Sequence, residues 1–217
     1  MRLPTLLPLL PFLVFVCLLS AALTPLFPAR AEATENDSIY VRVHISPEAY
    51  EAWRKSPMKH MHDFQDWREM TDQWSPDWVE YYYKWDFPTM GDLVRATERE
   101  AADWQPDAAA MQSRPYIHYD PQEGVFTYAQ LFYDENFINY MLDISAYRMF
   151  ADFKDTDTRD FLVVYPYFWD PGYTVILEIG RGYTKFHTEQ TAPAAFQEFI
   201  ETANAHFDAE IDALPED

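Results

Sequence analysis

The chain has 217 residues, of which 18% are aromatic, and its 36 Asp and Glu against 16 Lys and Arg give a net charge of −20. So acidic a surface repels nucleic acid and anionic lipid, because proteins bind both mainly by neutralising phosphate groups with Lys and Arg. Nucleic acid is therefore excluded as a partner. A basic or neutral protein partner is favoured, since the charge accelerates its encounter with the chain.

The first 33 residues have the layout of a secretory signal peptide. Arg2 gives a positive start, the apolar run Leu6–Leu23 follows, and two A-x-A cleavage sites come after it. We expect cleavage after Ala31 or Ala33 and a location in the periplasm or outside the cell. An uncleaved membrane anchor is the alternative, since the apolar run approaches the length that spans a bilayer. The prolines around the run favour cleavage, which leaves no stable anchor.

Cleavage leaves about 184 residues, which we assign to a single domain at 34–217 with a core of its own. The one cysteine, Cys17, is lost with the leader. Disulfides, thiolate zinc sites and cysteine nucleophiles are therefore excluded from the mature domain. Removal of Arg2, Arg30 and Glu32 leaves 14 basic against 35 acidic residues, so the net charge becomes −21.

One strand followed by helices is expected in residues 39–114. Apolar and polar residues alternate from Tyr40 to Ile45, which predicts a half-buried strand. Arg42 and His44 then lie on the face opposite the apolar side chains. Helix starts are indicated where a capping Ser or Thr, twice followed by Pro, precedes a helical pattern: Ser46 with Pro47, Ser75 with Pro76, and Thr89.

Residues 115–217 are predicted to form two units, each a β-hairpin followed by a helix. The first hairpin lies in 115–133, and a largely apolar helix follows from Glu135 to about Phe150. The second hairpin turns at Asp170–Gly172, and the final helix opens at Pro193. This repeated order suggests a duplicated hairpin-helix unit. The fold class expected for the domain is α+β, an antiparallel sheet of about five strands with helices packed on one face.

Seven aromatic residues stand within WSPDWVEYYYKWDFP, residues 74–88. If a helix begins at Pro76, four of the rings fall on one helical face, which is typical of core packing. The remaining rings exceed one stripe and should stay partly exposed. Exposed Trp and Tyr are typical anchors of protein interfaces. We therefore expect a contact surface that includes Trp74, Tyr83, Trp85 and Phe87.

Polar side chains gather on the outward faces of three expected strands, namely Arg42, His44, His118, Asp120 and Glu178. If these strands are neighbours, the open face of the sheet presents Arg, His and carboxylate together. We interpret this face as part of a partner-binding surface, because antiparallel sheets often face water on one side. An active site is the alternative. The chain contains none of the common hydrolase or phosphate-binding motifs, so no catalytic residue is assigned.

The stretch PMKHMHDF places soft and borderline metal ligands side by side. The candidates are Met58, His60, His62 and Asp63, which would suit copper or zinc. A solvated loop with one buried methionine is the alternative. Apart from this cluster, no cofactor is expected.

Export, single-domain size, negative charge, many aromatic residues and the lack of a catalytic motif together favour a binding or inhibitor protein over an enzyme. The leading hypothesis is an immunity-type protein that binds and neutralises a toxin or other protein partner in the periplasm. Two alternatives stay open: an envelope enzyme or carbohydrate binder that acts on cell-wall glycans through exposed Trp and Tyr, and a periplasmic copper or zinc carrier.

Overall fold

The structure is a computed structural model, and it describes residues 37–66, 87–105, 113–134, 137–168 and 172–213, all within one compact unit, Glu35–Asp217. The expected signal peptide with its cleavage sites lies outside these ranges. So do the predicted helix start at Ser75 and three of the predicted contact residues, Trp74, Tyr83 and Trp85.

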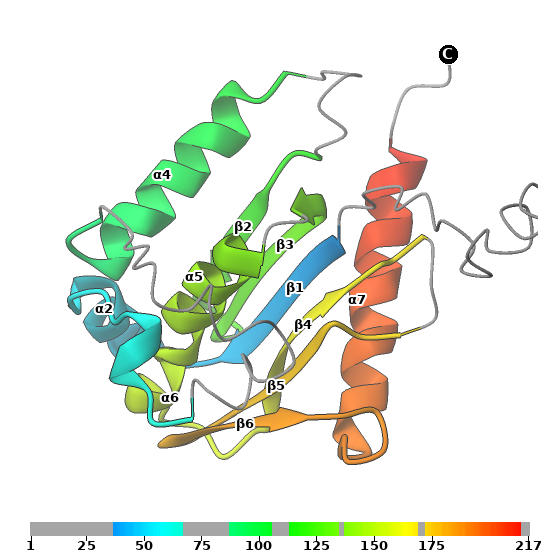
Figure 1. Cartoon of the computed structure of the whole chain (residues 1–217). Coiled ribbons are helices and arrows are strands. Elements are labelled where there is room, and N and C mark those ends of the chain that lie inside the picture. The colour runs from blue at the N-terminus through cyan, green and yellow to red at the C-terminus, as the bar shows by residue number, and fades with distance from the viewer. Residues whose placement is uncertain (1–36, 67–86, 106–112, 135–136, 169–171, 214–217) are drawn as a thin grey trace, which may run out of the picture. The chain divides into compact units, whose positions relative to one another are not determined.

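Six strands form one antiparallel sheet in the order β2-β3-β1-β4-β5-β6, with β2 and β6 at its edges (Figure 1). The strands are β1 (Asp37–His44), β2 (Tyr116–Asp120), β3 (Val125–Asp134), β4 (Asp160–Tyr165), β5 (Val175–Gly180) and β6 (Tyr183–His187). The helices are α2 (Pro47–Lys55), α4 (Met90–Asp103), α5 (Phe137–Arg148), α6 (Phe150–Phe153) and α7 (Ala195–Asp212), with a short 3-10 turn, η1 (Met61–Asp63).

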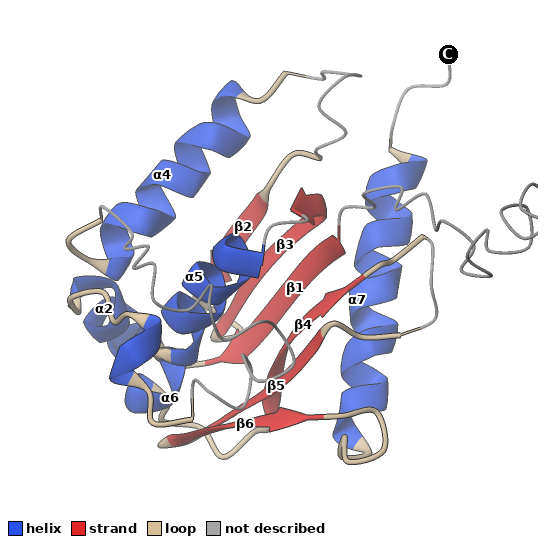
Figure 2. Cartoon of the chain, in the orientation of Figure 1, coloured by secondary structure: helices blue, strands red, loops and turns tan. Residues whose placement is uncertain are grey.

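The predicted α+β class is confirmed, but the sheet has six strands rather than about five, and helices cover both of its faces rather than one (Figure 2). Helices α2, α4, α5 and α6 share one core cluster with alternate strand residues such as Val41 and Leu162. Helix α7 packs with the other set, which includes Tyr40 and Phe161. Because both faces are covered, β4 and β5 are buried along their whole length.

Two helix starts expected from the sequence are present with their caps. The Ser46 hydroxyl accepts a hydrogen bond from the backbone N–H of Ala49 at 3.3 Å. Thr89 and Asp92 form a reciprocal capping box, in which each side chain accepts from the backbone N–H of the other. Such caps satisfy amides that the first turn of a helix leaves without a partner.

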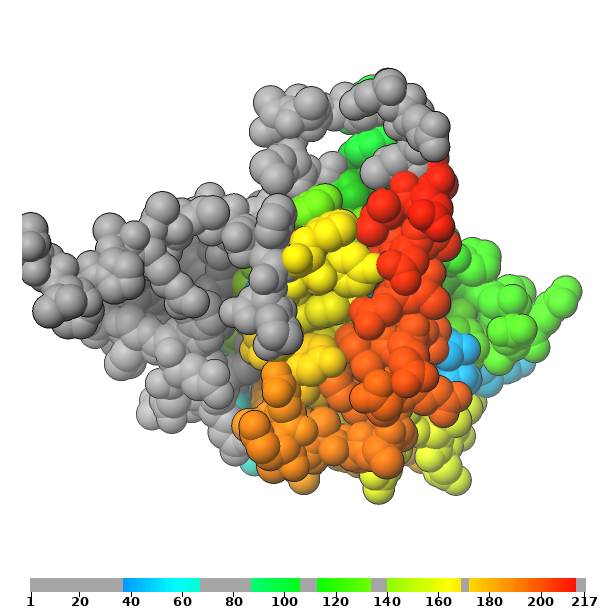
Figure 3. Space-filling model, turned by 90° about the vertical axis from the view of Figure 1, so that its right-hand side faces the viewer, coloured from blue at the N-terminus to red at the C-terminus, as the bar shows by residue number. Residues whose placement is uncertain are grey.

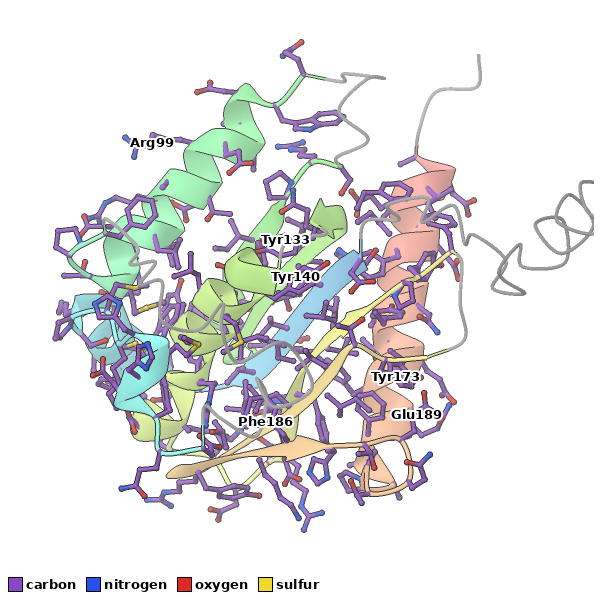
Figure 4. The ribbon with its side chains drawn as sticks, in the orientation of Figure 1. Arg99, Tyr133, Tyr140, Tyr173, Phe186 and Glu189 are labelled. Carbon is purple, nitrogen blue, oxygen red and sulfur yellow. The ribbon has the colours of Figure 1, made fainter. Side chains whose placement is uncertain are left out.

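Stacked rings attach the helices to the sheet and to each other. The rings of Trp53 in α2 and Phe150 in α6 are both fully buried and lie 3.9 Å apart between centroids. Tyr133 of β3 and Tyr140 of α5 pack at 5.8 Å (Figure 4). On the other face, the ring of Tyr40 meets the edge of Phe199 in α7 at 5.4 Å.

The order of hairpin and helix recurs as expected, although the second unit has three strands, β4, β5 and β6, before its helix. The helices of the two units, α5 and α7, pack against opposite faces of the sheet. Among the described helices, none combines the length and the apolar composition that a membrane span requires.

Candidate functional site

Three of the predicted contact residues lie in one lateral row of the sheet. Arg42 in β1 is paired with Thr127 of β3, and Thr127 is paired in turn with His118 of β2. On its other side, Arg42 is paired with Phe161 of β4, and Phe161 is paired with Glu178 of β5. Since neighbouring strands lie about 4.8 Å apart, Arg42 is about 10 Å from His118 and from Glu178 along the row. The three residues share a face, as predicted, but they do not form one site.

The expectation that Glu178 faces solvent is wrong, because its side chain is only 6% exposed. The Tyr183 hydroxyl donates to its Oε1 at 2.6 Å, and His187 Nε2 lies 2.9 Å from its Oε2. Burial opposes the charged carboxylate, but these two hydrogen bonds and the nearby Arg159 outweigh it, so the pKa of Glu178 is lowered. Glu178 therefore joins β5 to β6 inside the domain.

His187 has an oxygen acceptor at each ring nitrogen. Its Nδ1 lies 2.9 Å from the carbonyl oxygen of Thr191, and its Nε2 faces the Glu178 carboxylate. These two contacts hold the ring in place and connect the loop after β6 to the buried Glu178 carboxylate.

His44 takes part in a second buried network, at the end of β1. Its backbone N–H donates to Asp160 Oδ2 at 2.9 Å, and its Nδ1 lies 2.6 Å from Asp160 Oδ1. Lys154, whose side chain is fully buried, binds the same carboxylate. Its amine also donates to the Thr158 hydroxyl at 2.6 Å and to the His44 carbonyl at 3.3 Å. All three N–H groups of the lysine are thus used within the domain.

This network holds a histidine in the orientation that a general base needs, with Nδ1 fixed by a carboxylate and Nε2 left over. Burial, with Arg42 and Lys154 nearby, lowers the pKa of His44, which favours the neutral ring. Burial also lowers the pKa of Lys154 to about 8. No side chain in the described ranges is hydrogen-bonded to His44 Nε2, and the lysine is closed to solvent. The arrangement joins the end of β1 to the start of β4 and leaves His44 Nε2 without a hydrogen-bond partner among the described residues.

Two other predicted contact residues serve local structure. Asp120 Oδ1 accepts from the backbone N–H groups of Gln122 and Glu123, at 2.7 and 3.2 Å, and so stabilises the turn between β2 and β3. Phe87 is partly buried against the core cluster beneath α2 and α4. His118, by contrast, is exposed on β2 as the sequence predicted.

The predicted metal ligands are divided between the core and η1. Met58 packs against the hydrophobic core, and so does the neighbouring Met61. The carboxylate of Asp63 accepts from the backbone N–H of His60 at 2.8 Å. Among the residues that the structure describes, no group of three or more His, Cys, Asp or Glu side chains could hold a metal ion.

A groove with a volume of about 520 Å³ runs along β2. It is lined by Ala101 of α4, by residues 114–118 in and before β2, and by His206, Ala209 and Glu210 of α7. Ile117 packs towards the cluster beneath α4, whereas Tyr116 meets α7 on the opposite face. Since β3 lies on one side of β2, a groove that touches both faces must pass around the outer edge of the strand.

Rings and charged groups alternate along this groove. Tyr116 is 41% exposed, and the edge of its ring meets His206 at 4.7 Å. Burial lowers the pKa of His206, so that this ring is neutral at neutral pH. Burial raises the pKa of Glu210, against the opposing effects of Ser113 and Arg114, and its Oε2 has no hydrogen-bond partner among the described residues.

Beyond the groove, α7 leaves part of its sheet face uncovered. In Figure 3, α7 (orange to red) crosses this face, and green and blue atoms of the β2–β3 hairpin and of β1 emerge beside it. The predicted residues Arg42, His44 and His118 belong to these strands, and Arg42 and His44 are half-buried. Of these three predicted residues, His118 is the one that lines the groove.

Sequence reasoning found His118 but missed Arg114, Tyr116, His206 and Glu210. Tyr116 belongs to the same alternating stretch as His118 and could have been assigned to the same face. His206 and Glu210 lie beside the apolar stripe of α7. Their role depends on which face of the sheet α7 covers, and helical spacing does not contain this information.

Comparisons with models of protein families, with curated proteins and with solved structures found no match.

Proposed function

We propose that the chain is an exported, acidic binding protein of the immunity type, which captures a toxin or another protein partner in the periplasm and blocks it without catalysing a reaction. The observation that carries the proposal is the open groove along the outer edge of β2, with its mixture of rings and charged groups. Protein interfaces are typically built from such aromatic anchors within a polar rim.

The distribution of charge supports the same function. A net charge of −20 steers a basic or neutral partner towards the chain, while the contact itself is made by a small number of side chains. Tyr116 at the groove combines an exposed ring with a hydroxyl, the type of side chain that anchors interfaces. The carboxylates of Glu178 and Asp160 are each held by side chains of the domain itself.

The proposal is tested by capture with matched variants of the mature chain. Tagged wild type, Arg114→Glu and Lys185→Glu are each incubated with envelope extract, and retained proteins are identified by mass spectrometry. Arg114 lines the groove, whereas Lys185 is exposed on the opposite edge strand, so both variants make the same change of charge. We expect one basic or neutral protein to be retained by wild type and Lys185→Glu, lost with Arg114→Glu, and released by added salt.

Two results would count against the proposal. One is that wild type retains nothing beyond the tag control. The other is turnover of an envelope substrate by the purified chain. Retention of the same protein by all three forms would support the binding function but would show that the binding surface lies outside the groove.

Carbohydrate binding is a second candidate, because the exposed ring of Tyr116 lies beside polar groups that hydroxyls can bind. A sugar ring could stack on this tyrosine while Arg114 and Glu210 bind its hydroxyls. This function predicts retention of wild type on immobilised peptidoglycan fragments and loss of retention with Tyr116→Ala. If neither form is retained, the carbohydrate-binding hypothesis is rejected, and the hypothesis of a protein partner is unchanged.

A further inference from the structure

We propose that the partner enters the groove as an extended segment that pairs with β2 as an additional antiparallel or parallel strand and places a carboxylate beside Arg114 and His118. This inference rests on the proposed function, because it names how a protein partner is recognised at that surface. Its three supports are the outer backbone edge of β2, with which no described residue pairs, the alternation of its side chains and the charge of the groove.

The outer side of β2 has no backbone partner among the described residues. β2 is the terminal strand of the described sheet, in which it pairs with β3 alone. Within the described ranges, no backbone group pairs with the outer side of Tyr116–Tyr119. An extended peptide that lies along such an edge gains main-chain hydrogen bonds, while pockets for alternate side chains give specificity.

Side chains of an added strand would meet two different environments in alternation, because successive residues of a strand point to opposite faces. On one face they would meet Tyr116, His118 and His206. On the other face they would meet Ile117 and Ala101, which are apolar. The groove therefore fits a segment that alternates apolar residues with polar or acidic ones.

The charge of the groove favours a carboxylate on the polar side of this segment. Arg114 and His118 form no ion pair with other described residues, whereas Asp160 binds Lys154 and Glu178 lies 3.6 Å from Arg159. Glu210 is the acidic residue of the lining, and burial raises its pKa against the opposing effects of Ser113 and Arg114, which weakens its competition for Arg114. A carboxylate on the partner would bind Arg114 by charge-assisted hydrogen bonds.

The opposite edge strand, β6, is a poorer template. Its Tyr183 is turned back onto the domain, with its hydroxyl bound to Glu178, and its His187 is bound at both ring nitrogens. Lys185 is exposed on this strand, and a Lys on an edge strand discourages pairing with another chain. β6 therefore serves as the internal control.

The test uses the whole mature protein and a displayed library of random peptides of about ten residues, the length of a long strand. Peptides are selected on wild type, and those that bind Arg114→Glu equally well are discarded. Each selected peptide is then synthesised in single N-methylated forms, since methylation removes one backbone donor at a time. Affinities for wild type, Arg114→Glu and Lys185→Glu are measured by calorimetry.

Strand addition predicts that binding is lost with a period of two along the peptide, because only alternate N–H groups face β2. It also predicts an acidic residue in the selected peptides, whose change to the amide weakens binding about tenfold or more. Weaker binding to Arg114→Glu is a condition of the selection, so the informative variant is Lys185→Glu, which should leave binding unchanged.

Uniform tolerance of N-methylation, or a consensus without an acidic residue, would overturn the inference. Failure to select any peptide that distinguishes wild type from Arg114→Glu would overturn it as well. These results leave the capture experiment standing, because a folded partner could still bind the groove without adding a strand. Conversely, peptide binding with period two but no captured envelope protein would reject only the immunity-type function.

Discussion

The ring of Tyr183 lies over Gly180, and a Cβ atom added to this glycine would come within 2.1 Å of the ring atoms Cε1 and Cζ. The tyrosine hydroxyl thereby reaches Glu178 on the neighbouring strand. Two glycines so close together, Gly180 and Gly182, by themselves indicate only a bulge or turn. Gly182 fits that interpretation, since its φ is 77°, a backbone conformation that favours glycine. Gly180 is required for a different reason, the close approach of the ring.

We predict that Gly180→Ala displaces the ring of Tyr183 and breaks its hydrogen bond to the buried Glu178 carboxylate. A lost hydrogen bond to a charged buried group costs about 1.5–3 kcal/mol of unfolding free energy, which urea denaturation measures. Tyr183→Phe removes the same bond, so the double variant should cost less than the sum of the two single changes. Strict additivity, or a crystal structure of Gly180→Ala with the ring unmoved, would contradict this account.

A pH prediction follows from Glu178. The folded domain lowers the pKa of this carboxyl below 4.5, its ordinary value. A carboxyl whose pKa is lower in the folded state stabilises the fold above the unfolded pKa and loses this contribution as pH falls through the folded value. Unfolding free energy of wild type should therefore fall more steeply between neutral pH and about pH 3 than that of Glu178→Gln. Parallel pH profiles of the two proteins would refute the assignment.

Local features of this fold were readable from the sequence because they depend on neighbouring residues. The caps at Ser46 and Thr89 and the hairpin of β2 and β3 all involve contacts within a few positions. The side of the sheet that α7 covers was not readable from its own stripe. One available indication was the continuous apolar runs of β4 and β5, which are typical of strands covered on both faces.

The candidate site could be predicted only in part, because it depends on contacts between residues that are distant in sequence. His44 and Asp160 are 116 positions apart, and nothing in the spacing of either residue indicates the other. Arg42, His118 and Glu178 were correctly placed on one face, because strand alternation determines the face. Their separation by Thr127 and Phe161 depends on strand order, which alternation does not determine. For this reason the sequence predicted a joined polar face, and the structure has separate networks.

The buried pair of Lys154 and Asp160 should matter far more to stability than an exposed pair of the same type. Lys154→Met leaves Asp160 buried without its cation, and we expect a loss of about 3–5 kcal/mol in unfolding free energy. Lys59 and Asp152 form a matched surface pair, with side chains 40% and 46% exposed. Lys59→Met should cost at most about 1 kcal/mol. Chemical denaturation measures the unfolding free energy of both variants. Equal losses would show that burial of the pair has no effect on its contribution to stability.

Arg148 provides the last prediction, because its guanidinium is used in several ways at once. It is 5% exposed and lies 4.2 Å above the ring of Phe64 and 5.0 Å from that of Phe186. One of its nitrogens binds both carboxylate oxygens of Asp66, at 2.5 and 2.7 Å, and two bind the hydroxyl of Thr184.

Lysine keeps the charge of Arg148 but not the planar group that stacks between rings and binds several acceptors. We therefore expect Arg148→Lys to lower the unfolding free energy by about 2 kcal/mol. Arg181→Lys is the control, since Arg181 is 61% exposed and lies 3.7 Å from Asp157, and its change should be within about 0.5 kcal/mol of zero. If Arg148→Lys is as harmless as the control, charge alone accounts for the position, and the stacking between Phe64 and Phe186 contributes nothing measurable.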